Sequence, residues 1–144
     1  MSVYSKQVAL TVTAGGYSAN DVVGGRINFG TVPAGHRLKS VIVSDLAKQA
    51  GAYQLVLFKD GPTDIDDNAT FSIADADIQN VAGAIHITDS AGADKFDFTN
   101  NKLYCRQGLD LPIDANTLFG FLIALGTPTY AATTDVRVTL LFAS

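Results

Sequence analysis

One Asp-rich segment has oxygen-bearing side chains at a spacing that could bind a metal ion. Counting from Asp64, the third, fifth and twelfth positions are Asp66, Asn68 and Asp75. This spacing is similar to the opening of a calcium-binding loop, in which alternate oxygens surround one ion. The sixth position, however, is Ala69 rather than glycine, the twelfth is not glutamate, and no helices flank the segment. The alternative is a polar surface loop whose side chains cap turns, and we predict no bound metal and no cofactor.

Residues for acid–base and nucleophilic chemistry are few and isolated. The chain has two histidines, His36 and His86, one cysteine, Cys105, and no glutamate. A single cysteine excludes an intrachain disulfide and a zinc site built from several cysteines. A serine hydrolase needs a serine beside a histidine and a carboxylate, and no nucleophile-elbow motif is present. We therefore predict that the protein is not an enzyme.

Composition and charge argue against two further classes of partner. Ten Lys and Arg stand against 14 Asp, which gives a net charge of −4. An acidic protein is repelled by nucleic acid and by anionic membrane surfaces. No stretch approaches the roughly 18 apolar residues of a membrane span, and the first residues lack the apolar run of a signal peptide. We predict no nucleic-acid partner and no membrane association, and we expect a soluble intracellular protein. A virion protein that is made in the cytoplasm and released by lysis would have the same composition.

Apolar residues mostly recur with a period of two, which is the strand period. Turn residues separate short runs of this kind, at 8–12, 27–29, 38–46, 53–59, 85–87, 96–98, 109–113, 118–125 and 136–142. Only residues 75–81 could form a helical turn, and 144 residues suit one domain. The sequence predicts an all-β chain, a single-domain antiparallel β-sandwich over residues 1–144. We expect about eight strands in a jelly-roll-like order, with an immunoglobulin-like sandwich as the alternative.

The segment 53–59 is apolar on both of its faces. Tyr53 and Leu57 point to one side, and Val56 and Phe58 point to the other. Such a strand is either sandwiched inside the domain or covered on its outer side by another surface. We interpret the outer side as a subunit interface and predict a homo-oligomer. The alternative is a well-filled core of a monomer.

Several segments resemble a pattern found in small structural proteins of tailed bacteriophages. A strand ends in a hydrophobic-Phe segment and a Pro-Thr turn, then Asp-Asn and a Ser-x-x-Asp-x-Asp run follow, at 55–63, 67–69 and 71–77. The Asp-Val-Val-Gly-Gly segment at 21–25 and the closing strand at 136–142 are similar too. The resemblance implies a capsid decoration (cement) protein or a head-fibre component, commonly a β-sandwich trimer. It implies no catalytic residues.

Two functional hypotheses follow. The first is a virion decoration or cement protein that binds the major capsid protein and stabilises the outer capsid surface. The alternative is a carbohydrate- or receptor-binding β-sandwich module on a head fibre or tail, which needs exposed aromatic residues on loops. The candidate interface residues comprise two in an extended N-terminal arm at residues 1–6, one in the two-faced strand and two in loops: Val3, Tyr4, Tyr53, Tyr17 and Tyr130. A terminus without such contacts would instead be disordered.

Overall fold

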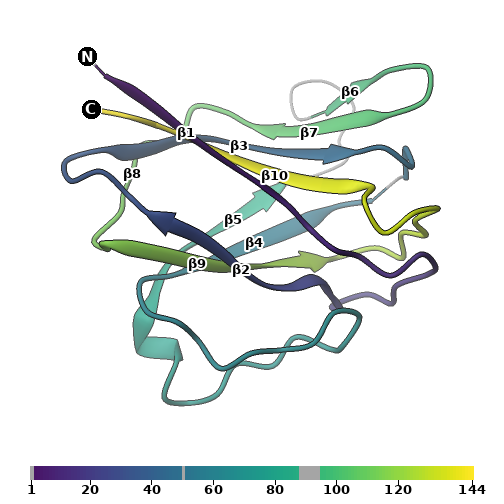
Figure 1. Ribbon diagram of the computed structural model, residues 1–144, viewed down its shortest axis with the longest axis horizontal. Coiled ribbons are helices and arrows are strands. Elements are labelled where there is room, and N and C mark those ends of the chain that lie inside the picture. Colours follow the sequence, from purple (N-terminus) through teal and green to yellow (C-terminus); the bar gives the residue numbers. More distant parts are fainter. Residues whose placement is uncertain (1, 50, 88–94) are drawn as a thin grey trace.

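A computed structural model describes residues 2–49, 51–87 and 95–144, which form two antiparallel β-sheets and one short 3-10 helix, Ile78–Asn80. The strands are β1 Val3–Ala9, β2 Val22–Thr31, β3 Arg37–Asp45, β4 Tyr53–Phe58, β5 Val81–Ile87, β6 Lys95–Asp97, β7 Lys102–Arg106, β8 Leu111–Pro112, β9 Thr117–Ala124 and β10 Val136–Ala143. The predicted all-β sandwich is confirmed (Figure 1).

The longer strands pair as a long hairpin would if it were folded over on itself. The first strand pairs with the last, β1 with β10, and the pairs β2–β9, β3–β7 and β4–β5 follow inward. These pairs stand in the order β1-β10-β3-β7 in one sheet and β2-β9-β4-β5 in the other. The short β6 and β8 are additions beside β7 and β3. This is the order of a jelly roll, and an immunoglobulin-like sandwich does not fit it.

The main hydrophobic core lies between the two sheets and follows the period of two. Val41 and Val43 of β3 are fully buried in it, whereas Ile42 between them lies on the opposite face of its sheet. Tyr53 and Leu57 of β4 are buried in the same core. Side chains at alternate strand positions point to opposite faces, so the sequence pattern alone assigns these residues correctly.

A second, smaller core covers the outer face of the sheet β2-β9-β4-β5. Val56 and Phe58 of β4 are buried in it together with side chains of β9. The connection between β4 and β5 crosses this face (Figure 1) and packs three apolar side chains against it: Ile65, Phe71 and Ile73. The two-faced segment 53–59 is therefore covered by its own chain, and it no longer supports a subunit interface.

The N-terminal residues form an edge strand rather than an arm. β1 pairs with β10 along its whole length, and the Ser144 N–H donates a hydrogen bond to the Ser2 carbonyl. The arm expected at residues 1–6 is therefore a wrong prediction for the described residues 2–6. The reason is that the partner strand lies at the other end of the chain, so no local pattern signals the pairing.

Gly24 of β2 is a position where a side chain does not fit. Its φ of +84° is left-handed, and a Cβ there would lie 2.8 Å from the Cβ of Leu10. Gly108 has a similar φ of +72°, but nothing lies within 4 Å of its Cβ position. We expect Gly24→Ala to lower the free energy of unfolding by about 2 kcal/mol more than Gly108→Ala, because only Gly24 adds a clash to the backbone strain. Urea unfolding of both variants measures this. Equal losses of unfolding free energy would contradict the close contact between Gly24 and Leu10.

Candidate functional site

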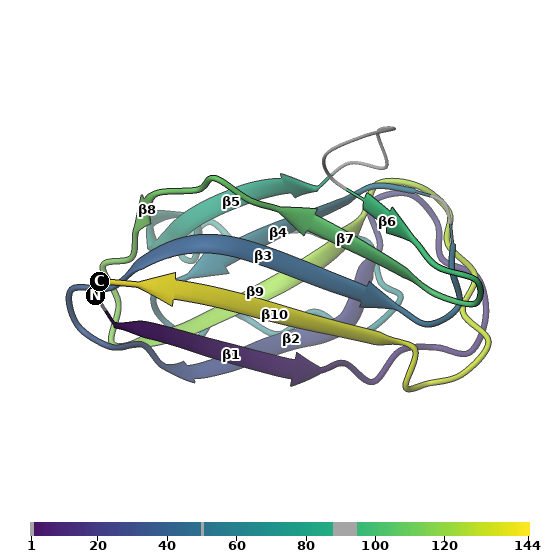
Figure 2. The same cartoon turned by 90° about the horizontal axis from the view of Figure 1, so that it is seen from above.

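The outer face of the sheet β1-β10-β3-β7 is crossed by no described segment (Figure 2). The strand registers arrange its outward side chains in rows, of which the middle one comprises Gln7, Thr139, Ile42 and Cys105. The flanking rows comprise Ser5, Leu141 and Ser40 on one side and Ala9, Arg137, Ser44 and Leu103 on the other. We call the residues of these three rows the open face.

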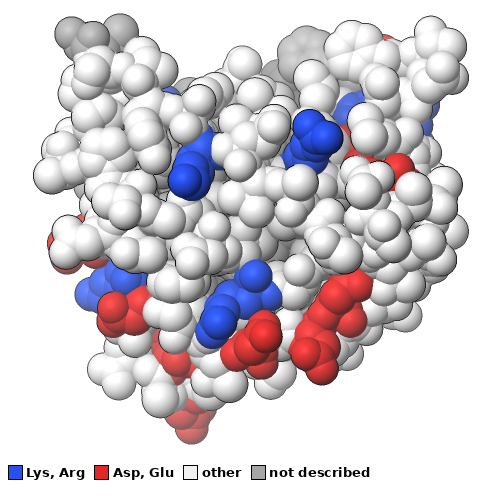
Figure 3. Space-filling view, viewed as in Figure 1, with Lys and Arg blue, Asp and Glu red and all other residues white. Residues whose placement is uncertain are grey.

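The open face is nearly uncharged. Arg137 is its one charged residue, and half-buried Ile42, Leu103 and Leu141 lie among small polar side chains. The cores of protein interfaces are depleted in charged residues in the same way. The opposite side is acidic, and aspartate side chains gather along the lower part of Figure 3, where Figure 1 places the β4–β5 connection. The two sides of the molecule therefore offer different chemistry to a partner.

One end of the open face deepens into a hollow of about 340 Å³. Leu46 and Phe98, which line it, are 48% and 51% exposed, an unusual exposure for large apolar side chains. The Arg137 side chain also lines the hollow, and its guanidinium makes no hydrogen bond or ion pair with any described residue. Lys102, nearby, pairs with Asp97 at 3.4 Å. Apolar walls beside an available guanidinium suit an apolar protein surface that carries a carboxylate.

Three of the tyrosines expected as interface anchors are buried. Tyr17, Tyr53 and Tyr130 are 4%, 1% and 2% exposed. The hydroxyl groups of Tyr53 and Tyr130 hydrogen-bond to each other, and the Tyr17 and Tyr130 rings meet edge to face with centroids 5.5 Å apart. A tyrosine can be buried when its hydroxyl finds a partner. Tyr17 and Tyr130 lie outside the strands, as expected, but their burial makes the expectation of exposed interface anchors wrong, and all three tyrosines belong to the core.

The other two expected anchors lie in β1. Val3 is 68% exposed and points outward beside the open face. Tyr4 is half-buried, packs its ring 6.1 Å from that of Phe142 and donates a hydrogen bond to the Thr31 carbonyl at 3.3 Å. Of the five expected anchors, Val3 is the one whose side chain is free to meet a partner.

Asp67 is a structural carboxylate that no pattern in the sequence singles out. It accepts hydrogen bonds from the hydroxyl groups of Tyr17 and Thr13, both at 2.6 Å, and from the Gly24 N–H at 2.7 Å. These bonds tie the β4–β5 connection to the start of the sandwich. Burial, and then the bond to Asp67, raise the pKa of Tyr17 to about 12. No sequence signal marks the network, because its donors stand 43 to 54 positions before Asp67.

The four residues with calcium-loop spacing, Asp64, Asp66, Asn68 and Asp75, are all exposed and are not gathered into a site. In the part of the chain that is described, no three His, Cys, Asp or Glu side chains lie together so that they could hold a metal ion. Asn68 instead adopts a left-handed φ of +66° and donates a hydrogen bond from its side chain to the Gly16 carbonyl at 3.3 Å. Asp64, Asp66 and Asp75 thus fit the alternative of a polar surface loop.

We expect the melting temperature to be the same, within about two degrees, in excess EDTA and in millimolar calcium. A ligand that bound only the native state would stabilise it by mass action, and the described residues offer no cluster for it. Thermal melts followed by circular dichroism measure this. A rise of more than a few degrees with calcium would revive the metal site.

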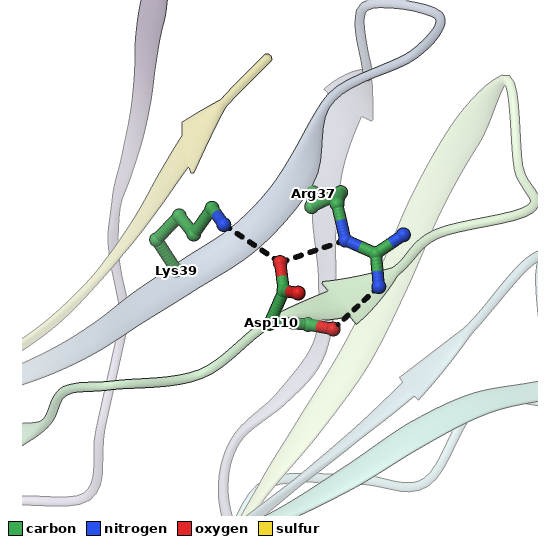
Figure 4. A network of polar contacts seen from close by, with 3 residues as sticks. All are labelled: Arg37, Lys39 and Asp110. Atoms are coloured by element: carbon green, nitrogen blue, oxygen red, sulfur yellow. Dashed lines mark hydrogen bonds and ion pairs between the residues drawn. The ribbon is translucent and has the colours of Figure 1, made fainter.

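A surface ion cluster joins the segment before β8 to β3 (Figure 4). Arg37 Nε and Lys39 Nζ donate to one carboxylate oxygen of Asp110 at 2.7 and 2.6 Å, and Arg37 Nη2 donates to the Asp110 carbonyl at 2.9 Å. The bond from Lys39, and then that from Arg37, lower the pKa of the Asp110 carboxyl. All three side chains are solvent-exposed, so the cluster adds little stability, and we assign it the role of fixing this segment.

The histidines and the cysteine stand apart from carboxylates. Cys105 is buried with its sulfur 4.0 Å from the Ser40 hydroxyl, His36 bonds to the Ser2 hydroxyl at 3.0 Å, and His86 is exposed on β5. Among the described residues, no histidine or cysteine is hydrogen-bonded to a carboxylate. That the protein is not an enzyme stays a prediction.

A larger groove, of about 580 Å³, lies at one end of the sandwich. The β2–β3 turn, the end of β4 and the β8–β9 connection line it, with the half-buried ring of Phe119 among the lining residues. The side chains of Lys59, Asp60, Asp114 and Asn116 also line it, and they have no hydrogen bond or ion pair with described residues. Polar groups beside an aromatic ring are what a small polar ligand needs.

No protein-family model and no curated protein sequence matches the chain. Within the described ranges, no helix is long and apolar enough to cross a membrane.

Proposed function

We propose that the protein is a non-catalytic structural component of a virion, a decoration or cement protein that binds and stabilises the outer surface of a capsid. The observation that carries this proposal is the unequal covering of the two sheets. One outer face is sealed by the β4–β5 connection over its own small core, whereas the open face has no described cover and a single charge. The resemblance of residues 55–77 supports the virion setting, and the major capsid protein is the proposed partner.

The open face suits this role physically. Broad protein contacts gain affinity from buried area and from a few anchors at their centre. Ile42 lies in the middle row, and the hollow beside Leu46 and Phe98 can take an apolar side chain of the partner. A protein that binds only the assembled shell stabilises that shell by mass action. With the open face against the capsid, the acidic β4–β5 connection would face the solvent.

A charge placed on each side of the molecule tests which side binds. Ile42→Glu puts a carboxylate in the middle of the open face, and Ile78→Glu makes the same change on the other side, where Ile78 is 62% exposed. We expect Ile42→Glu to weaken binding to capsids stripped of this protein by at least about tenfold, because a carboxylate would have to lose its hydration in the middle of the contact, and Ile78→Glu to have little effect. Co-sedimentation measures both, and the reverse result would place the binding side on the β4–β5 connection.

Loss of the protein is expected to leave particles less resistant to heating and osmotic shock. Particles with and without the protein are compared for release of packaged nucleic acid. If particles that lack it survive equally well but no longer attach to host cells, the cement proposal fails and receptor binding takes its place.

The homotrimer is proposed on the resemblance alone, since the two-faced strand β4 is covered by its own chain. Light scattering at micromolar concentration is expected to give three times the 15.1 kDa of one chain. A clean 15.1 kDa species would contradict a stable trimer in solution.

A second candidate function is carbohydrate or receptor binding, which the groove at the end of the sandwich favours. Its carboxylates and amide could bond sugar hydroxyls, and the Phe119 ring could pack on a sugar face. A glycan array tests this, with Asp114→Ala and Asn116→Ala as variants that should lose any signal. Binding that both variants retain would place the ligand elsewhere.

A further inference from the structure

We propose that β1 accepts an extended, acidic segment of the capsid partner as an added strand. This inference rests on the proposed function and deepens it, because it names how the partner would be held at the rim of the open face. It depends on three features of β1: the edge that faces away from β10 has no partner strand, the strand is regular, and a charged residue lies at its centre.

The hydrogen-bond pattern leaves one side of β1 unpaired. At one end of the β1–β10 ladder the Leu10 N–H donates to the Val136 carbonyl, at 3.0 Å. At the other end the Ser144 N–H donates to the Ser2 carbonyl, also at 3.0 Å, and the register between them is continuous. Hydrogen-bonded positions alternate in an antiparallel ladder, so the even-numbered residues of β1 bond to β10. The N–H and C=O groups that point to the free edge belong to Val3, Ser5, Gln7 and Ala9.

The other edge strands are interrupted or short. β2 holds three glycines of positive φ and two register shifts, and the β4–β5 pairing shifts register between Leu57 and Phe58. The described part of β6 has three residues. β1, by contrast, has seven residues without glycine, proline or a register shift. Bulges and short strands protect edges from unwanted pairing, so an uninterrupted edge is a place where a partner strand can add.

The charge of Lys6 determines which kind of partner strand can pair with the free edge of β1. It lies at the centre of β1 and, by strand alternation, points to the core side between Tyr4 and Val8. The Lys6 ammonium group lies beside Gly30, where a Cβ would be 3.3 Å from its nitrogen. It makes no hydrogen bond or ion pair with any described residue. A strand added at this edge would cover the ammonium group. An uncharged or basic strand would leave it buried and unpaired, which is costly, whereas an acidic strand would pair with it.

The same charge disfavours a second copy of β1 as the occupant. Two β1 strands paired antiparallel about Lys6 would place two ammonium groups directly opposite each other, and like charges at opposed positions are destabilising. The partner is therefore a different chain with a carboxylate near the centre of its extended segment.

A double proline variant tests strand addition. Ser5→Pro with Gln7→Pro removes two N–H donors at the free edge and none from the β1–β10 ladder, and edge strands tolerate proline there. The matched control, Ser5→Val with Gln7→Val, keeps both donors and changes only side chains. We expect the proline variant to bind stripped capsids at least about tenfold more weakly than wild type, with the control within about threefold. Circular dichroism checks that both variants fold.

The outcomes separate this inference from the proposed function. If wild type and both variants bind equally, the strand-addition inference is overturned and the decoration proposal stands. An equal loss of capsid affinity in the proline and valine variants would also overturn it, because side chains rather than backbone groups would then make the contact. If the wild type forms a dimer and the proline variant does not, a second copy of the chain occupies the edge, and the proposal of an acidic partner segment is overturned.

If wild type does not bind capsids at all, the proposed function fails, and the edge is then tested on the wild-type protein alone. The probe is a nine-residue peptide in which valine and threonine alternate around a central aspartate, with a lysine-centred peptide as its match. At millimolar concentration we expect the acidic peptide alone to slow amide hydrogen exchange at the outward N–H groups of β1. No slowing, or equal slowing by both peptides, overturns the inference.

Discussion

Raising the pH from 10 to 12 is expected to unfold the protein. Burial raises the pKa of Tyr17 to about 12, and burial raises the pKa values of Tyr53 and Tyr130 well above their ordinary value of 10.0. In this range the unfolded chain has lost these protons while the folded chain keeps them, so stability falls as the pH rises. Each such tyrosine removes about 1.4 kcal/mol per pH unit. Three together remove about 4 kcal/mol per unit, against a total stability of roughly 5–15 kcal/mol.

Tyrosinate absorbance and circular dichroism, followed in one alkaline titration, measure this effect. The buried tyrosines are expected to ionise only in step with the loss of the circular dichroism signal, and below pH 10 their contribution to stability stays complete. Ionisation of all five tyrosines near pH 10 in a protein that remains folded would contradict the buried cluster.

Replacing Asp67 is expected to destabilise the protein by about 4 kcal/mol. Asp67→Ala leaves the hydroxyl groups of Tyr17 and Thr13 and the Gly24 N–H without their acceptor. Hydrogen bonds to a charged group contribute roughly 1.5–3 kcal/mol each, and buried donors without a partner add a further cost. The β4–β5 connection would also lose its attachment to the sandwich.

The neighbouring aspartate provides the matched control. Asp66 is exposed, so we expect Asp66→Ala to change the free energy of unfolding by less than about 0.5 kcal/mol. Urea unfolding compares the two variants, and hydrogen exchange in Asp67→Ala is expected to rise in the β4–β5 connection before the sheet β1-β10-β3-β7. Equal stability of the two variants would contradict the role of Asp67.

The period-two pattern predicted the strands because alternation is a local consequence of strand geometry. The runs at 53–59 and 118–125 match β4 and β9 to within one residue at each end. The expected helical turn at 75–81 contains the 3-10 helix Ile78–Asn80. Pairing between distant strands, as in β1 with β10, left no such local trace.

The candidate site could be predicted only in part. Alternation placed Ile42 opposite Val41 and Val43, but it could not tell that nothing described covers Ile42 while the β4–β5 connection covers Phe58. Whether a face is covered depends on where a distant connection runs. For the same reason Tyr17 and Tyr130, in glycine-, proline- and threonine-rich segments typical of exposed loops, proved to be core residues.

The most direct test of the central proposal is a cryo-EM map of the virus particle at a resolution that traces this chain. We predict the chain on the outer surface of the capsid, with the open face and β1 against the major capsid protein and the β4–β5 connection toward solvent. A particle without this chain, or one in which the β4–β5 connection meets the shell and the open face is bare, would contradict the proposal.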